Sequence, residues 1–339
     1  MATINDVAKM VGVSVTTVSK VINGKGSISA KTTEQVKEAI ARLGYSPSSV
    51  ARALVMKKTN IIGVVLERLS DPFFYDLINS IEKGIAGTQY KLMFCNSNGD
   101  SDKRREYIHF LTQGGVDGII VYGSYISDES AIAKAAAMGF PLVVIENELN
   151  RCDVNNLIID NVNSAAKAVH YLVENGHRKI AHIVGKPEIK IAHDRFNGYL
   201  QAMKECQCEI LNNYVVQSQM NYASGYEAMI HLIELPDRPT AVFCADDATA
   251  CGAIDAVLDR KLRVPEDISI VGFDDQKILP TMYRSFIALT TLRQPLLSIG
   301  EKSVKMLIES IAYPEKAKVQ EKYQCDLVVR ESSCRCFQP

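Results

Sequence analysis

Residues 4–23 read INDVAKMVGVSVTTVSKVIN, and this stretch decides the fold of the N-terminal region. Apolar residues recur at helical spacing on each side of Gly12, which interrupts the pattern. Ser14 is placed to cap a second helix, and Asn23-Gly24 ends it. Two short helices joined by a tight glycine turn predict a helix-turn-helix, whose second helix enters the major groove of DNA.

The second helix carries the side chains that we expect to read base edges. Val15 suits contact with a thymine methyl, Thr16 can donate or accept, and Lys20 can reach guanine acceptors. Other polar residues suit phosphate contacts, which position the protein without reading sequence. These are Thr3, Ser14, Thr17, Ser19, Asn23, Ser29 and Thr32. The alternative is a small helical bundle with ordinary polar surface residues.

A short segment follows the third expected helix, which is capped by Ser29 or Thr32. Ser46-Pro47 opens this segment, which runs to Leu54 and is too short to be stable as an isolated helix. Such a segment is expected to fold only on binding, here on DNA. Its candidate minor-groove contacts are Ser48, Ala51 and Leu54. Leu54 could wedge between base steps, or it could pack on the body of the protein.

Charge is divided unevenly along the chain. The 339 residues carry a formal net charge of −1. The first 60 residues hold nine Lys or Arg and three Asp or Glu, which leaves +6 there and −7 in the remainder. A basic head on an acidic body indicates a polyanionic partner for the head alone, although a surface with scattered ion pairs would also show positive charge.

From residue 61 onward, short β-branched runs alternate with amphipathic stretches. The expected strands are 61–66, 91–95, 118–122, 142–145, 157–159, 179–184, 241–244 and 268–273. The expected helices are 72–87, 102–113, 127–138, 162–175, 194–206, 223–234, 247–260 and 296–312. This alternation predicts parallel, doubly wound sheets with helices on both faces. About ten strands exceed what one sheet comfortably holds, which indicates two lobes.

Several absences from the sequence narrow the class of protein. The start MATINDVAKM lacks an apolar signal stretch and no run approaches membrane-spanning length, so we expect a cytoplasmic protein without a membrane partner. The nine cysteines form no CxxC pair, which favours reduced thiols over a metal site at Cys334 and Cys336. No nucleotide fingerprint, P-loop, HExxH or GxSxG motif occurs, so we expect no enzyme, cofactor or metal.

Together these motifs resemble the lactose/galactose repressor (LacI/GalR) family of transcriptional regulators. The resemblance rests on residues 4–23, 29–32, 43–47, 51–54, 63–65, 71–74, 116–120, 176–180, 195–198, 264–275, 289–291 and 327–332. It implies a small all-α helix-turn-helix head and an α/β body like a periplasmic binding protein, with a small molecule in the cleft between two doubly wound lobes. It also implies a homodimer on a near-palindromic operator, with hinge helices that insert the paired Leu54 side chains.

The expected domains are a helix-turn-helix head over 1–45, a hinge over 46–59 and a body over 60–339. Within the body, the expected first lobe covers about 60–160 plus 291–320, and the second about 161–290 plus 321–339. The family usually has Arg where Lys20 stands and Asn where Ser48 stands. Because Lys lacks the bidentate fork that suits guanine, the base preference is expected to differ from that of relatives.

The candidate effector contacts follow predicted strands, because ligands of open α/β sheets bind at the carboxyl ends of strands. Matched to the family pattern, they are Phe73, Ser124, Asp160, Arg195, Met220, Asp246 and Asp274. Carboxylates with one Arg and an aromatic ring suit a polyhydroxylated ligand, so we expect a sugar or sugar derivative. A purine or a protein corepressor is the alternative, and Asp246, Asp247 and Asp275 could simply cap helices.

Overall fold

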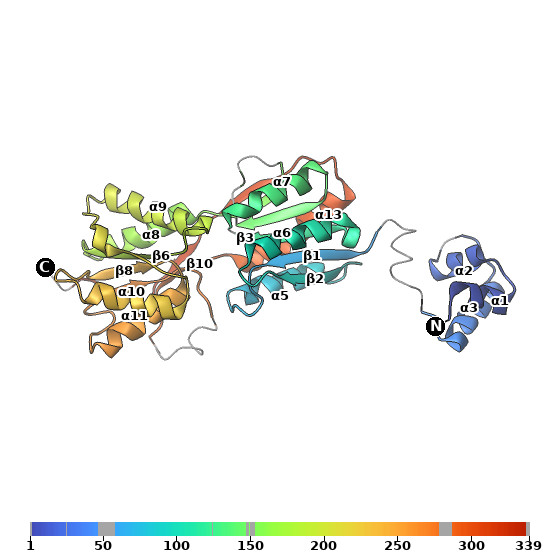
Figure 1. Ribbon diagram of the computed structural model, residues 1–339, viewed down its shortest axis with the longest axis horizontal. Coiled ribbons are helices and arrows are strands. Elements are labelled where there is room, and N and C mark those ends of the chain that lie inside the picture. Colours follow the sequence, from blue (N-terminus) through green and yellow to red (C-terminus); the bar gives the residue numbers. More distant parts are fainter. Residues whose placement is uncertain are drawn as a thin grey trace. The chain divides into compact units, whose positions relative to one another are not determined.

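The computed structural model describes residues 2–24, 26–46, 58–123, 125–146, 149, 153–277 and 287–336. The chain divides into two compact units, Met1–Asn60 and Ile61–Pro339 (Figure 1). The expected hinge residues Ser48, Ala51 and Leu54 lie outside the described residues, as does the expected pocket residue Ser124.

The first unit contains the three expected helices, α1 (Ile4–Val11), α2 (Val15–Ile22) and α3 (Ala30–Leu43). Each helix contributes one fully buried valine to a common core, Val7, Val18 and Val36. Gly12 ends α1 with a φ of 71°, a left-handed conformation that glycine adopts without strain. The helix-turn-helix predicted from the spacing is therefore confirmed.

The first lobe of the second unit is a six-stranded parallel sheet in the order β11-β5-β4-β3-β1-β2. Its strands are β1 (Ile61–Leu66), β2 (Lys91–Asn96), β3 (Gly118–Gly123), β4 (Leu142–Glu146), β5 (Asn155–Ile159) and β11 (Gln320–Tyr323). Its helices are α5 (Phe74–Ile85), α6 (Ser101–Phe110), α7 (Glu129–Ala137) and α13 (Leu296–Ala312), with short turns η1 (Leu111–Gly115) and η2 (Ile126–Asp128). Alternate strand residues pack on α5 and α13 on one face and on α6 and α7 on the other.

The second lobe is a four-stranded parallel sheet in the order β7-β6-β8-β9. Its strands are β6 (Ile180–Val184), β7 (Val215–Gln217), β8 (Ala241–Cys244) and β9 (Ser269–Val271). Its helices are α8 (Asn161–Glu174), α9 (Lys190–Glu205), α10 (Tyr222–Ile233) and α11 (Asp247–Asp259), with the short turn η3 (Asn212–Tyr214). Figure 1 shows α8 and α9 on one side of the sheet and α10 and α11 on the other.

The backbone joins the two lobes at three places within the described residues. It passes from β5 into α8, from β10 (Thr291–Arg293) into α13, and from β11 into β12 (Asp326–Val328). β10 and β12 pair with each other in an antiparallel ladder, with Leu292 opposite Leu327. Two of the three connections between the lobes therefore pass through this two-stranded ladder, and the third is the connection after β5.

Most of the expected body elements are present, with bounds that differ by a few residues. Four short strands were not expected: β7, β10, β11 and β12. Because β11 pairs with β5, the first lobe extends to Tyr323, and the expectation that residues from 321 onward lie in the second lobe is wrong for this strand. Helix α9 begins at Lys190, ahead of the expected 194. No helix among the described residues is long and apolar enough to cross a membrane.

Candidate functional site

Helix α2 presents the side chains expected to read DNA bases. Val15, Thr16 and Lys20 are all exposed, and Val15 retains 39% of its accessible surface although it is apolar. The aliphatic part of Lys20 lies along the Gly26 backbone, where a Cβ would be 3.3 Å from Lys20 Cδ. An exposed valine beside polar residues at a helix start is the surface that a major-groove contact requires.

The residues expected at the DNA backbone are engaged at helix ends. Thr3, Ser14 and Ser29 are the N-cap residues of α1, α2 and α3. The Thr17 amide donates to Ser14 Oγ over 3.1 Å, and the Thr32 amide does the same to Ser29 Oγ. These caps fix where each helix begins, and helix N-termini are favourable places for a phosphate.

Asn23 closes α2 at its other end. Its Nδ2 donates to the Ser19 carbonyl over 2.9 Å and lies 3.3 Å from Ser19 Oγ. Both side chains therefore stabilise the end of the helix, which is a structural role in addition to the expected phosphate contact.

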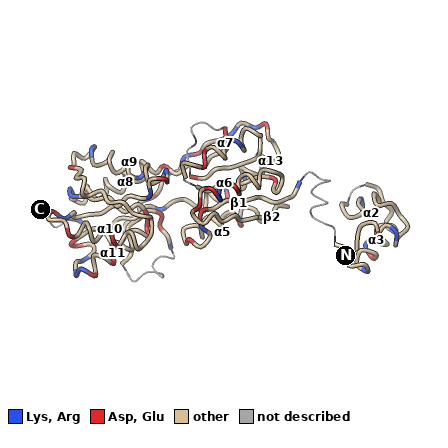
Figure 2. Tube along the Cα trace, in the orientation of Figure 1, with Lys and Arg blue, Asp and Glu red and all other residues tan. Residues whose placement is uncertain are grey.

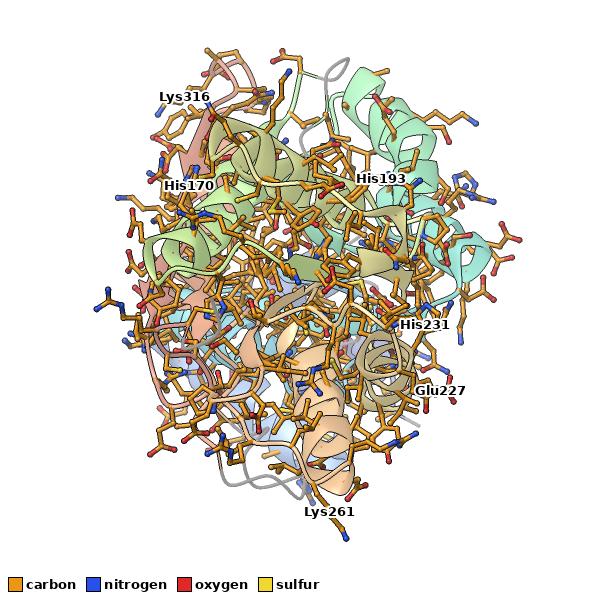
Figure 3. The ribbon with its side chains drawn as sticks, turned by 90° about the vertical axis from the view of Figure 1, so that its left-hand side faces the viewer. His170, His193, Glu227, His231, Lys261 and Lys316 are labelled. Atoms are coloured by element: carbon orange, nitrogen blue, oxygen red, sulfur yellow. The ribbon has the colours of Figure 1, made fainter. Side chains whose placement is uncertain are left out.

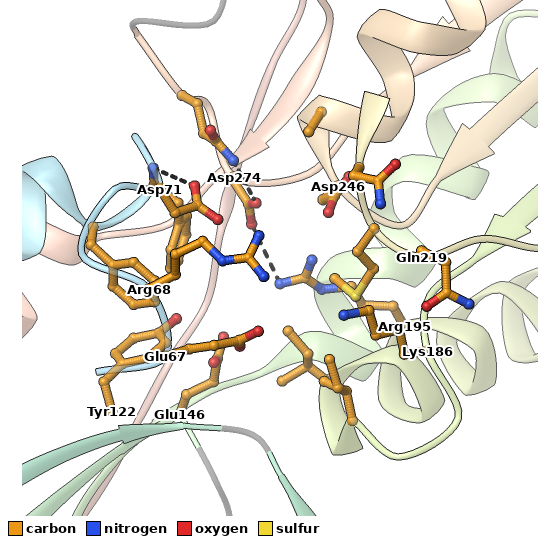
Figure 4. Close-up of a pocket in the computed structure, with 18 residues that line it drawn as sticks. Glu67, Arg68, Asp71, Tyr122, Glu146, Lys186, Arg195, Gln219, Asp246 and Asp274 are labelled. Carbon is orange, nitrogen blue, oxygen red and sulfur yellow. Dashed lines mark hydrogen bonds and ion pairs between the residues drawn. The ribbon is translucent and has the colours of Figure 1, made fainter. Parts of the chain in front are cut away.

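A pocket with a volume of about 150 Å³ lies between the two lobes, at the carboxyl ends of strands of both sheets (Figure 4). Its lining residues are Glu67, Arg68, Asp71, Phe73, Phe74, Tyr122, Glu146, Lys186, Ile189, Ile191, Arg195, Gln219, Met220, Asn221, Asp246, Ala248, Asp274 and Gln276. Five of the seven expected effector contacts are among them: Phe73, Arg195, Met220, Asp246 and Asp274.

Arg195 is the most constrained side chain of the second-lobe wall. It is 1% exposed, and its guanidinium carbon lies 3.6 Å from the centre of the Phe273 ring. Its Nε donates to Asn161 Oδ1 over 2.9 Å and its Nη1 to the Ala245 carbonyl over 2.6 Å. The remaining contact, from Nη2 to Asp274 Oδ1 over 3.4 Å, makes a buried ion pair. The guanidinium is thus held in one orientation at the pocket.

Three side chains contact the carboxylate of Asp274. Its carboxylate accepts from Gln294 Nε2 over 2.7 Å and from Gln276 Nε2 over 3.3 Å, in addition to Arg195. Its backbone φ is 119°, which a residue with a side chain rarely adopts. Burial raises the pKa of Asp274, and the Arg195 charge opposes that shift.

Asp246 has both of the roles that the sequence left open. Its carboxylate caps α11 by accepting from the Thr249 amide over 2.7 Å, and it lines the pocket. Asp247 is not a lining residue and accepts from Thr291 Oγ1 and the Gln276 amide, so its role is structural. Asp275 likewise pairs with Arg293 and Arg330 rather than capping a helix.

Asp160 lies outside the lining residues, contrary to expectation. It is the N-cap of α8, where it accepts from the Asn163 amide over 3.3 Å, and Lys322 lies 3.6 Å away. Asp71 does not cap α5, which begins at Phe74. Its carboxylate instead accepts from the Phe73 amide over 3.0 Å, one residue ahead of the helix.

Sequence reasoning missed most of the first-lobe wall. Glu67 follows β1 directly, Tyr122 lies near the end of β3, and Glu146 is the last residue of β4. The strand-end rule that selected Phe73 would have selected all three. The rings of Phe73, Phe74 and Tyr122 contact each other edge to face, with centroids 5.1 to 5.7 Å apart.

The described histidines and cysteines form no metal-binding cluster. Figure 3 shows His170, His193 and His231 well separated from one another. His170 pairs with Glu205 over 3.0 Å. The described cysteines are free thiols.

Comparisons with known proteins agree with this architecture. Residues 3–48 match the bacterial regulatory proteins of the lacI family, and residues 169–333 match a periplasmic binding protein-like domain. The HTH-type transcriptional repressor PurR of Mannheimia succiniciproducens is 34% identical over 334 residues, with 98% of both chains covered.

Two solved structures extend the likeness to the whole chain. The lac repressor dimer bound to operator and the anti-inducer ONPF matches with a TM-score of 0.83 and 26% identity, covering 98% of this chain and 99% of that one. The transcriptional regulator CelR–cellobiose complex matches with a TM-score of 0.73 and 26% identity, covering 98% and 100%. The chain therefore belongs to the lacI family of bacterial regulatory proteins and is a DNA-binding transcriptional repressor, not an enzyme.

Proposed function

We propose that a sugar or sugar derivative binds in the pocket between the lobes, and that its binding sets the affinity of a homodimer of this cytoplasmic repressor for operator DNA. The observation that carries the proposal is the fixed Arg195 guanidinium beside the carboxylates of Asp246 and Asp274. Sugar hydroxyls both donate and accept hydrogen bonds, so they can satisfy a wall of this mixed chemistry.

The makeup of the pocket lining favours a sugar over a purine. A volume of about 150 Å³ is below the range of about 300–1,000 Å³ usual for drug-sized ligands, so the pocket suits a small ligand such as a sugar. A flat purine would be held best between two aromatic walls. The described lining residues of the second lobe instead include Met220, Ile189 and Ile191 and no aromatic ring. The fold is also that of a regulator solved as a cellobiose complex.

The homodimer is supported by exposed apolar surface on neighbouring helices of the first lobe. Tyr75 on α5 is 58% exposed and Leu297 on α13 is 51% exposed, and the two helices pack side by side. Two copies would bring two α2 helices to the two halves of a near-palindromic operator. Light scattering should then give about twice the chain mass of 37.4 kDa at micromolar concentration, and a monomer would contradict the dimer.

The proposal is tested by measuring operator binding across a panel of ligands. A fluorescent operator, first selected from random duplexes, is titrated with the full-length protein alone and with monosaccharides, disaccharides, purines and amino acids. We expect sugars to shift the operator affinity, and the direction of the shift shows whether the sugar induces or corepresses. Binding of purines or amino acids alone would contradict the sugar proposal.

A matched pair of variants links the shift to the pocket. Asp274→Asn keeps the size of the side chain but removes its charge, and should weaken sugar binding about tenfold or more, because hydrogen bonds to charged groups contribute about 1.5–3 kcal/mol. Asp153→Asn makes the same change at an exposed position outside the pocket and should leave sugar binding unchanged. Equal behaviour of the two variants would place the sugar elsewhere.

A further inference from the structure

The two walls of the pocket differ in charge balance. On the second-lobe wall, the carboxylates of Asp246 and Asp274 face two cations, Lys186 and Arg195. Arg195 pairs with Asp274, and the Lys186 charge acts on Asp246. The charges of this wall are therefore matched within the protein.

The first-lobe wall carries an excess of negative charge. Three of its lining side chains are carboxylates, Glu67, Asp71 and Glu146. Among the described lining residues of this wall the cation is Arg68, which is exposed and acts on Asp71. Figure 4 shows Glu67 and Glu146 extending into the same part of the pocket, and the Glu67 charge acts on Glu146.

Glu146 and Tyr122 are buried next to each other in this wall, and the Tyr122 hydroxyl acts on the Glu146 carboxylate. They are 3% and 4% exposed, and both line the pocket. Glu146 Oε1 has no hydrogen-bond partner among the described residues. Because buried polar groups in native proteins are nearly always paired, the Oε1 atom of Glu146 indicates a ligand atom that donates to the carboxylate.

The charges around Glu67, Tyr122 and Glu146 favour a positively charged ligand group in this part of the pocket. Burial raises the pKa of Glu146 to about 7, and the nearby Glu67 charge acts in the same direction, while Arg195, a hydrogen bond from Tyr122 and Arg104 oppose it. A cation beside Glu146 would stabilise the charged carboxylate that burial destabilises. The aromatic cluster of Phe73, Phe74 and Tyr122 adds ring surface that attracts cations.

We propose that the effector carries a protonated amine, held by Glu146, Glu67 and the aromatic cluster, and is therefore an amino sugar rather than a neutral sugar. An ammonium group has three donors and no acceptor, which matches a corner rich in carboxylate oxygens. A hydroxyl would supply a single donor and no charge. This inference rests on the proposed function of the pocket as a sugar site.

Calorimetry of the full-length protein tests the inference with three sets of sugars. These are glucosamine, galactosamine and mannosamine, their N-acetyl forms, which remove the charge, and the parent hexoses. We expect at least one amino sugar to bind tenfold or more tightly than both its hexose and its N-acetyl form. A hexose that binds as tightly as its amino counterpart overturns the inference that the effector carries an amine, while it leaves the sugar proposal intact. Binding of none of these sugars overturns the amino-sugar inference, and the operator titration with the wider panel then decides the sugar proposal.

Two variants assign the preference to Glu146. Glu146→Gln keeps the shape but removes the charge and one acceptor oxygen, so the tenfold preference for the amine should fall to less than threefold. Glu106→Gln, at an exposed position on α6 of the same lobe, should keep the preference in full. A Glu146→Gln protein that retains the preference contradicts the assignment.

Proton release from the unaltered protein gives a readout that does not depend on a variant. At pH 6 the amino sugar is protonated and Glu146 is largely neutral, since its pKa is about 7. Binding of the ammonium should therefore release a proton from Glu146, seen as a binding heat that changes with the ionisation enthalpy of the buffer. A binding heat that is the same in all buffers contradicts the proposed contact.

Discussion

Glu146 concentrates two unfavourable features in one residue. Its φ of 82° lies in the left-handed region, which costs about 1–3 kcal/mol for a residue with a side chain. Its carboxyl is buried, which raises its pKa from 4.5 to about 7. Residues that are strained and poorly solvated in this way concentrate at functional sites, because the surrounding structure must hold them in place.

The raised pKa of Glu146 predicts how its replacement changes stability with pH. The unfolded chain loses the Glu146 proton near pH 4.5 and the folded chain only near pH 7, so this group lowers the stability of the folded protein as pH rises between these values. Glu146→Gln lacks this effect. Its stability relative to the unaltered protein should therefore increase by about 2 kcal/mol from pH 5.5 to pH 8.

Urea unfolding of both ligand-free proteins at the two pH values measures this change. Other titrating groups, such as Asp247, whose pKa burial also raises to about 7, are common to both proteins. Glu106→Gln serves as the control, because its carboxyl is exposed. A stability difference that does not vary with pH would show that Glu146 is not a destabilising charge.

At the scale of elements, the helices of the head depend on their caps. α2 has only eight residues, so it cannot be stable by itself and relies on its ends and on packing. Ser14 holds its first turn through the Thr17 amide, and Asn23 holds its last turn through Ser19. The orientation of Val15 and Lys20 toward a DNA groove depends on these two ends.

Removal of the Ser14 cap should loosen α2 without unfolding the body. Ser14→Ala is expected to cost about 1 kcal/mol, which is about a fivefold loss of protection of the α2 amides against hydrogen exchange. Ser14→Asp supplies another capping oxygen and should restore most of that protection. Equal exchange in all three proteins would mean that packing alone holds the helix.

Elements with strong patterns could be predicted, and short polar ones could not. The helix ends of the head follow from Ser14, Ser29 and Gly12, because caps and turns are local chemistry. β11, with the sequence QEKY, has no apolar pattern and is a strand only because β5 offers it an edge. β10 and β12 have three residues each and depend on their mutual pairing, which no local signal encodes.

Part of the pocket could be predicted from the sequence, namely the residues whose positions follow from local signals. The rule that ligands meet the carboxyl ends of strands selected Asp246 and Asp274, the match to the family pattern selected Arg195, and all three line the pocket. The same rule, applied without knowing how the two sheets face each other, included Asp160, which caps a helix instead. Applied to every strand end, the rule would also have selected Glu146, which directly follows the expected strand 142–145.

At the scale of the whole molecule, the opposite charges of head and body predict different responses to salt. The head holds the net positive charge, and Figure 2 marks its Lys and Arg residues. Operator affinity should fall more than tenfold between 50 and 200 mM salt, since phosphate contacts release counterions. Sugar binding in the pocket should change less than threefold, because buried charges are screened weakly. Titrations of the protein with operator DNA and with sugar at the same salt concentrations measure the two responses. Equal salt dependence of DNA and sugar binding would contradict the proposed difference between head and body.

The three connections between the lobes also constrain how the sequence can vary. Strands β10 and β12 pair with each other. A residue inserted into either strand would shift its register against the other strand and turn the following side chains to the opposite face. The turn after α9, at residues 206–211, joins elements within one lobe and has no such partner in a ladder. Insertions and deletions are therefore expected to accumulate in turns of that kind, while the lengths of the interlobe strands remain fixed.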